Sequence, residues 1–492
     1  MGGDLHNPLL EREPDIDEIT DYKIFAREAI KENKKLWNLA APAIFTSLAQ
    51  YSLGAITQVF AGHLTTLELD AVSTENMVIA GLAFGIMLGM GSALETLCGQ
   101  AFGAKRLDML GIYMQRSWVI LNSTCVLMLP IYIWATPILK FFGQNDEIAK
   151  LAGTFSLYMI PQLFAYGFNF PLQKFLQAQS KVWTMAWIAG IALAFHILCS
   201  WLLIVQFKWG LVGAAISLNL SWWINVLGQF AYIAIGYCLA LGLVLVGVPL
   251  KHWVALLGFQ LLQHLEFWYY MLLVVLAGRL KDAQVAVAAI SICTNLNGWE
   301  IMVFFGFNAA ISVRISNELG AGRPRAAKFA ILVIVMFSIV LGVFFFALVL
   351  GLRKVYGVPF TNSEEVVHAV SDLAVVFALA VLLNSIQPVL TGVAVGAGWQ
   401  KIVAYINLAC YYIVGLPLGF FLGSVLNMNV VGIWTGMITG VGLQTLILIL
   451  LTLLTNWEKE ARLAGSRVKQ WGGSLDQEPE TNGKSIRNGD GV

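Results

Sequence analysis

The chain has 492 residues, of which 58% are hydrophobic and only 12% are charged, about half the charged share of a soluble globular protein. Residues 1–36 hold 15 of the 59 charged side chains and residues 457–492 hold 12. Soluble enzymes, nucleic-acid binders and disordered proteins are therefore excluded, and a net charge of +1 creates no field for an acidic partner. The composition predicts an all-α protein that crosses the lipid bilayer many times.

The N-terminal segment is acidic and lacks an apolar stretch, so we expect no secretory signal peptide. The stretch 21–36 predicts either an amphipathic helix in the membrane interface, with Ile24, Phe25 and Ile30 available to lipid, or a plain solvated helix. The six cysteines lie in apolar stretches without paired or metal-like spacing. We therefore expect neither disulfides nor a metal site.

A membrane-spanning helix needs roughly 20 mostly apolar residues. Runs of this kind, cut at polar breaks, predict twelve spanning helices. They cover residues 37–62, 71–99, 111–140, 149–170, 183–206, 211–238, 250–277, 284–315, 326–352, 366–396, 402–424 and 430–455.

Lysine and arginine favour the cytosolic side of a membrane. They are concentrated before the first span and after the last. The even-numbered connections also carry more of them than the odd-numbered ones, and Lys174 is predicted to lie in the fourth connection. Both termini are therefore predicted to be cytosolic. The expected organisation is a cytosolic N-terminal tail (1–36), an N-terminal lobe of six helices (37–238), a connection (239–249), a C-terminal lobe of six helices (250–455) and a cytosolic C-terminal tail (456–492).

The two predicted lobes share four short sequence anchors in the same order. The offset between matched residues drifts only from 216 (Ala61 to Ala277) to 219 (Val212 to Val431). Two six-helix halves that each begin in the cytosol are related by an axis along the membrane normal. Such a pair encloses a central cleft, and rocking of the halves would open it alternately to each side.

Glu266 lies near the middle of the seventh predicted span. An ionised carboxylate at this depth costs roughly 2.5–3.5 kcal/mol and usually faces a cavity or a partner. Gln263 and Tyr270 share its helical face. Because protonation can favour one conformation and deprotonation another, Glu266 is the predicted proton-coupling residue. The alternative is a packing role, with the carboxyl satisfied by these neighbours.

Polar residues at helical spacing predict the walls of the cavity. Asn384 and Gln387 form a stripe on the tenth span, and Asn297 and Glu300 share a face of the eighth. The predicted lining residues in full are Gln263, Tyr270, Asn297, Glu300, Asn384, Gln387, Gln50 and Tyr51. The alternative for each is a hydrogen bond between helices.

Two further acids lie on the second span. Glu75 is near its outer end, which predicts an interfacial position. Glu95 lies within about two turns of the cytosolic end, where the alternative to a functional role is a structural ion pair with Arg116.

The anchors contain two motifs, GSALETLCGQAFGA (91–104) and NELGAG (317–322). Together they resemble the paired signature of multidrug and toxic compound extrusion (MATE) transporters. LEFWYY (265–270) and GVAVGAGWQ (392–400) are similar to the plant DETOXIFICATION branch. The family-signature residues are Glu95, Gln100, Gly103, Asn317, Glu318 and Gly320.

The resemblance implies the MATE fold, an all-α membrane protein with twelve transmembrane helices in two pseudo-symmetric six-helix lobes. It also implies export of organic solutes in exchange for protons, with no cofactor. Many plant members carry an Asp where this chain has Asn384, which cannot titrate, so Glu266 is left to serve alone. Some flavonoid-transporting members share this Asn, which favours a flavonoid-type solute.

Three functions compete. The first is a proton/solute antiporter acting by alternating access, the second a uniporter or uptake carrier of the same fold, and the third a membrane-embedded lipid-modifying enzyme. The six histidines show no ligand spacing, which disfavours the enzyme. We expect a monomer in the vacuolar membrane, favoured by Leu9-Leu10 in the acidic tail, with the plasma membrane as the alternative.

Overall fold

The structure is a computed structural model that describes residues 14–17, 21–237, 283–359 and 363–471. Within these ranges the regular elements are all helices. The first half comprises α1 (Tyr22–Gly62), α2 (Thr66–Thr74), the π-helical η1 (Glu75–Ala80), α3 (Gly81–Gly103), α4 (Leu107–Ile133), α5 (Ala135–Phe141), α6 (Asp146–Tyr158), α7 (Ile160–Ala178), α8 (Val182–Ser200), η2 (Trp201–Gln206), α9 (Gly210–Tyr232) and η3 (Ile233–Tyr237).

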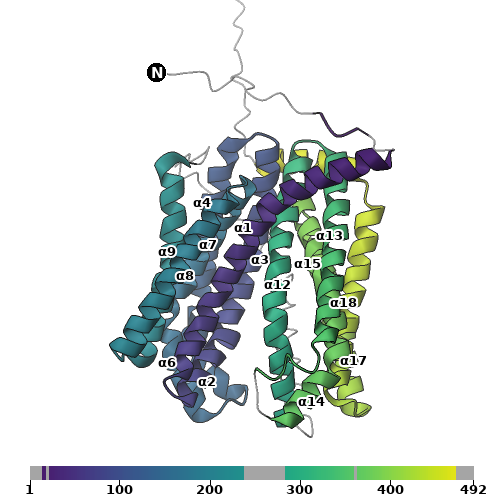
Figure 1. Cartoon of the computed structure of the whole chain (residues 1–492). Coiled ribbons are helices and arrows are strands. Elements are labelled where there is room, and N and C mark those ends of the chain that lie inside the picture. Colours follow the sequence, from purple (N-terminus) through teal and green to yellow (C-terminus); the bar gives the residue numbers. More distant parts are fainter. Residues whose placement is uncertain (1–13, 18–20, 238–282, 360–362, 472–492) are drawn as a thin grey trace, which may run out of the picture.

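The second half continues the bundle beside the first (Figure 1). It comprises α12 (Ala283–Gly320), α13 (Pro324–Gly351), α14 (Glu364–Asp372), α15 (Ala374–Ala397), α16 (Gln400–Asn407), η4 (Leu408–Gly415), α17 (Leu416–Phe420), η5 (Phe421–Val425), α18 (Asn429–Leu454) and α19 (Trp457–Trp471).

The described ranges contain ten helical stretches that are long and apolar enough to cross a membrane. The fourth predicted span, 149–170, is divided at Met159 between α6 and α7. Pro161, near the start of α7, explains the division because it cannot donate a backbone hydrogen bond to the preceding turn. The seventh predicted span, 250–277, lies outside the described residues.

Helix α1 connects the two lobes (Figure 1). It begins over helices of the second half and runs down among those of the first. Leu36 and Ala40 are buried in an apolar core of the second half, whereas Ala43 and Leu53 are buried in the core of the first. Pro42 lies at the crossing point. The first predicted lobe therefore shares its first helix with the second lobe.

The predicted amphipathic segment 21–36 is the beginning of α1 and lies partly against the protein. The ring of Phe25 packs edge-on against Phe329 of α13, with 5.7 Å between ring centroids. Ile24 and Ile30 are exposed. This part of the helix therefore has one face on α13 and another that is free to contact lipid or water.

An ion network fixes the start of α1 to α12. Arg314 Nε donates to Glu32 Oε1 at 2.6 Å and its Nη2 donates to Oε2 at 3.0 Å. Arg314 also pairs with Glu318, whose Oε2 lies 2.6 Å from Arg323 Nε. Both carboxylates are buried. The network holds the turn between α12 and α13 in place.

The C-terminal segment from residue 456 contains α19, which the sequence analysis did not predict. Trp457 and Ala464 are buried in the core of the second half, and Val468 in the core of the first. Arg467 Nη1 donates to the carbonyl of Ala397 at 2.7 Å. Helix α19 therefore contacts both lobes.

We predict that Arg314→Ala destabilises the protein strongly. The substitution leaves Glu32 and Glu318 buried without their shared cation, which costs about 3–5 kcal/mol. The melting temperature of the purified protein in detergent should fall markedly. Arg462→Ala is the matched control: the Arg462 side chain is 82% exposed, at 4.0 Å from Glu458, and exposed pairs contribute about 0–1 kcal/mol. Equal melting temperatures for the two variants would contradict a stabilising role of the network.

Candidate functional site

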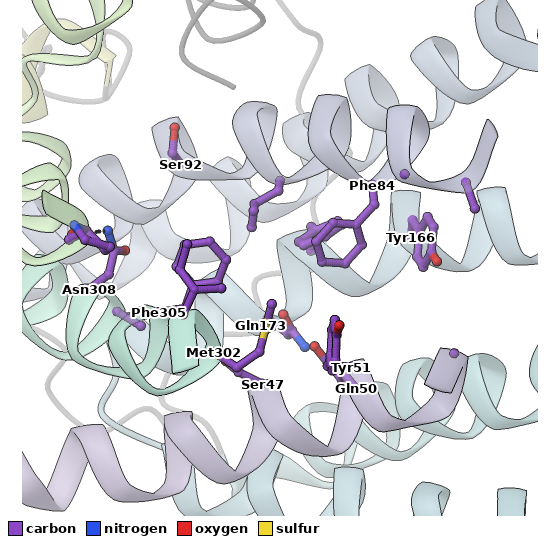
Figure 2. Close-up of a pocket in the computed structure, with 18 of the residues that line it drawn as sticks. Ser47, Gln50, Tyr51, Phe84, Ser92, Tyr166, Gln173, Met302, Phe305 and Asn308 are labelled. Atoms are coloured by element: carbon purple, nitrogen blue, oxygen red, sulfur yellow. Dashed lines mark hydrogen bonds between the residues drawn. The ribbon is translucent and has the colours of Figure 1, made fainter. Parts of the chain in front are cut away.

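A cavity of about 420 Å³ lies between the two lobes. Figure 2 shows side chains from α1, α3, α7 and α12 converging on it. Its aromatic lining consists of Tyr51, Phe84, Tyr166, Phe170, Trp222, Trp299 and Phe305. Its polar lining consists of Ser47, Gln50, Gln58, Asn76, Ser92, Glu95, Gln162, Gln173, Lys174, Gln177, Asn295, Asn308, Gln387, Thr391 and Asn407.

Three of the predicted lining residues lie on this cavity. Gln50 and Tyr51 come from α1 and Gln387 from α15. The Tyr51 ring packs edge-on against Trp299 of α12, with 5.3 Å between centroids. The Gln387 amide donates to Thr391 at 3.3 Å. The cavity wall thus combines rigid aromatic surfaces with amides that can bond to a solute.

The other predicted residues are placed differently. Asn384 donates to Asn297 at 2.8 Å, and this buried amide pair links α15 to α12. Glu300 on α12 has two buried carboxylate oxygens without a hydrogen-bond partner. These three side chains are not among the residues that line the cavity. Glu266, Gln263 and Tyr270 lie outside the described residues.

A buried ion pair forms part of the cavity wall. Lys174 Nζ on α7 lies 2.5 Å from Glu95 Oε2 on α3, and the two side chains are 9% and 2% exposed. Glu95 thus forms a structural ion pair, but its partner is Lys174 instead of the predicted Arg116. The assignment of Lys174 to a cytosolic connection was wrong, because α7 continues to Ala178, eight residues past the predicted end at 170.

Glu75 is a second correction. The sequence predicts an interfacial position, but the side chain is fully buried in η1. The helical stretch that contains it begins at Thr66, further out than the predicted start at 71, so Glu75 lies inside the bundle. Both of its carboxylate oxygens lack a hydrogen-bond partner. Glu75 does not itself line the cavity, although its neighbour Asn76 does.

One end of the cavity is sealed by contacts between the lobes. We call it the closed end, and it comprises residues 96–103 of α3, 312–320 of α12 and 395–400 at the end of α15. Thr96 Oγ1 donates to the carbonyl of Val395 at 2.5 Å and accepts a hydrogen bond from Gln400 at 2.5 Å. Gln100 donates to the carbonyl of Gly396 at 3.3 Å.

Glycines permit the close approach at this end. A methyl group at Gly103 would collide with the carbonyl of Asn317, and one at Gly320 would collide with the carbonyl of Gln100. Small residues of this kind let helix backbones touch. The Asn317 amide also donates to the carbonyl of Ala178 at 3.3 Å. Four of the six signature residues, namely Gln100, Gly103, Asn317 and Gly320, therefore make contacts between the lobes at the closed end.

Comparisons with known proteins agree with this architecture. A family model described as MatE matches residues 42–202 and 261–421, one stretch in each half. Protein DETOXIFICATION 33 of Arabidopsis thaliana is 55% identical over 491 residues, covering 97% of this chain and all of the relative. Protein DETOXIFICATION 31 of the same plant is 53% identical, covering 95% and 90%. The chain belongs to the MATE family.

Solved MATE structures share the fold. The crystal structure of the eukaryotic MATE transporter AtDTX14 matches with a TM-score of 0.85 and 33% identity, covering 89% of this chain and 99% of that one. The Vibrio cholerae MATE transporter VcmN in the bent form matches with a TM-score of 0.76 at 16% identity, which bears on the fold alone. The predicted all-α fold of twelve spanning helices in two lobes is confirmed, and this MATE protein is a transporter rather than an enzyme.

We predict that Lys174 and Glu95 are energetically coupled. Lys174→Met leaves a buried carboxylate without its cation, which costs about 3–5 kcal/mol. Adding Glu95→Gln should restore much of the lost stability, because the unpaired charge is then gone. Melting temperatures of the two single variants and the double variant measure this coupling. Strictly additive losses would show that the two side chains do not stabilise each other.

We predict that Gly103→Ala opens the closed end. The added methyl meets the Asn317 carbonyl, and such overpacking typically costs about 1–3 kcal/mol. The measurement labels Thr391→Cys, at a cavity residue, in a Cys98→Ala background. A membrane-impermeant thiol reagent is added from the side of the closed end. Labelling should be about tenfold faster with Gly103→Ala than with Gly103 intact, if the substitution destabilises the closed conformation by ~1.4 kcal/mol.

Gly465→Ala is the matched control for this experiment, since a methyl at Gly465 on α19 meets open space. It should leave the labelling rate unchanged. An unchanged rate in Gly103→Ala as well would show that contact between these backbones does not seal the cavity.

Proposed function

We propose that the protein exports organic solutes from the cytosol in exchange for protons, by alternating access of the central cavity. The observation that carries the proposal is a cavity between two lobes that is sealed at one end by the family-signature residues. A cavity closed at one end by contacts between movable bodies suits a carrier. The family membership and the DETOXIFICATION relatives support the same reading.

Alternating access requires α3 to separate from α12 and α15. The hydrogen bonds at the closed end join side chains such as Thr96 and Gln100 to backbone carbonyls. These donors and acceptors would meet water when the lobes part, so separation leaves few groups unsatisfied. The contacts at the glycines are lost at the same time, and no bulky side chain has to leave a packed site for this to happen.

Helix α1 would bend during this motion, because its two parts belong to different lobes. Pro42 lies between them and has no N–H to donate to the carbonyl of Asn38. Thr46 Oγ1 donates to the Pro42 carbonyl at 2.8 Å, which further loosens the helical pattern locally. Kinks form most readily where a backbone hydrogen bond is already missing. Pro42 is therefore the proposed hinge of α1.

The cavity lining favours a planar, uncharged solute with hydroxyl groups. Tyr51, Trp299 and Phe305 offer ring faces and edges on which a flat solute can pack. Gln50 Nε2 is buried without a hydrogen-bond partner and can donate to a hydroxyl or carbonyl oxygen. The charged lining residues described, Glu95 and Lys174, neutralise each other. These features fit a flavonoid-type metabolite, and the cavity volume suits a molecule of that size.

Glu266 remains the proposed proton-coupling residue of the C-terminal lobe. Asn384 occupies the position of a second acid in many relatives of the family, and its amide is committed to Asn297. An amide does not exchange protons in this way. The second candidate function, a uniporter or uptake carrier, follows from this loss and differs from the first in having no proton counterflow.

Orientation and location belong to the same proposal. The lysines and arginines of the two tails favour cytosolic termini, which would make the closed end cytosolic. We propose a monomer in the vacuolar membrane, with the plasma membrane as the alternative. A fluorescently tagged protein imaged with markers of both membranes distinguishes these locations.

The decisive experiment uses the full chain reconstituted in liposomes. With an imposed pH gradient, the protein should concentrate a radiolabelled flavone glucoside and move protons in the opposite direction. Glu266→Gln should reduce the gradient-driven transport strongly while leaving solute exchange measurable. Solute flux without proton counterflow would favour the uniporter, and full coupling in Glu266→Gln would remove that residue from its role.

A further inference from the structure

Buried acids without a partner need an explanation, and Glu75 is the clearest case in the described part of the chain. Its side chain is 0% exposed, and neither carboxylate oxygen has a hydrogen-bond partner. Glu95, by comparison, is paired with Lys174. Glu300 is also unpartnered, but it is only partly buried. Among the acids in the described ranges, Glu75 is therefore the one whose burial is complete and uncompensated.

The surroundings of Glu75 contain tyrosines and no described cation. Helices α2, α3 and α6 pack against η1, and Tyr132 of α4 and Tyr166 of α7 lie within electrostatic range of the carboxyl group. The Tyr132 hydroxyl is itself buried without a partner. The charged residues of α2 and α6 lie at partly or fully exposed positions. They are Glu68, Asp70, Asp146, Glu147 and Lys150.

An ionised carboxylate in this position would have neither a cation nor a donor to stabilise it, which is strongly unfavourable inside a bilayer. The neutral, protonated carboxyl group is the form that such surroundings favour. A solute or a metal ion does not fit this role, because the side chain has no exposed surface. A proton is the one ligand that such a site can take up and release.

The cavity lies directly beside this site. Asn76, the next residue, lines the cavity, and so does Tyr166 (Figure 2). The Tyr166 hydroxyl accepts a hydrogen bond from Gln162 at 2.7 Å. Short π-helical segments in α-helices often mark functional sites. Conversion of η1 to an α-helix would shift the register by one residue and turn Glu75 toward the position of Asn76. Deprotonation would then take place into the cavity.

We propose that Glu75 is a proton-binding site of the N-terminal lobe, separate from Glu266. Glu75 exchanges its proton with the cavity when η1 changes from a π-helix to an α-helix. The site rests on the proposed antiport function. It would supply the second titrating acid that Asn384 removes from the C-terminal lobe. Protonated Glu75 would accompany the conformation described here, and its deprotonation would accompany the opposite one.

The first test measures the number of protons exchanged per solute. The full chain in liposomes is given a fixed pH gradient at zero membrane potential, with a radiolabelled flavone glucoside that has no ionisable phenol. The limiting accumulation of an uncharged solute changes tenfold per pH unit for each coupled proton. Glu75→Gln keeps the side-chain shape but cannot titrate, so accumulation should fall about tenfold at a gradient of about one pH unit.

The second test does not depend on a solute. Infrared difference spectra of the purified protein between low and high pH should contain a carbonyl stretching band of a protonated carboxylic acid that disappears in Glu75→Gln. Glu75→Asp keeps a carboxyl group and should retain the band and the proton count. Glu68→Gln, on the same side of the bundle, should change neither measurement.

The outcomes separate the two proposals. Absence of gradient-driven accumulation in the unmodified protein would overturn the proposed antiport. Normal accumulation in the unmodified protein and an equal accumulation in Glu75→Gln would overturn the Glu75 site alone. An unchanged infrared band in Glu75→Gln would do the same. A purely structural role predicts a lower melting temperature for Glu75→Gln without a change in the proton count.

Discussion

Contact between the backbones of α3 and α12 is the constraint on which the rest of the architecture depends. Gly103 and Gly320 bring the two helices so close that a single methyl group on either would meet a carbonyl of the other. This proximity allows Thr96 and Gln100 to reach carbonyls at the end of α15. The cavity exists because the lobes are held together at this end and the space beyond it is left to aromatic and amide side chains.

The buried acids Glu32, Glu95 and Glu318 are each paired with a lysine or an arginine. Glu95 is compensated by Lys174, and Glu32 and Glu318 share Arg314. Each of these pairs joins separate segments of the chain or fixes a turn, so the charges contribute positional specificity as well as attraction. Against this background an uncompensated acid such as Glu75 stands out as a group with another purpose. Whether a buried acid has a cation or hydrogen-bond donor beside it, and not its depth alone, separates structural acids from candidate functional ones.

Sequence reasoning predicted the spans, the repeat and the motifs because these depend on local patterns. It also predicted that Gln50, Tyr51 and Gln387 line the cavity, because polar residues at helical spacing in apolar helices seldom face lipid. It misplaced Lys174, because a single lysine looks like the end of a span unless its partner Glu95 on another helix is known. The burial of Glu75 likewise depends on packing of η1 against α2, α3 and α6, which no local sequence pattern reveals.

Helix α19 has a consequence for how the protein is made. Its side chains enter the apolar cores of both lobes, through Trp457 and Ala464 on one side and Val468 on the other. It is also the last of the described helices to leave the ribosome. The contacts of α19 with both lobes can therefore form only after the helices from α1 to α18 have been synthesised. Among the described contacts between the lobes, those of α19 thus involve the segment that is synthesised last.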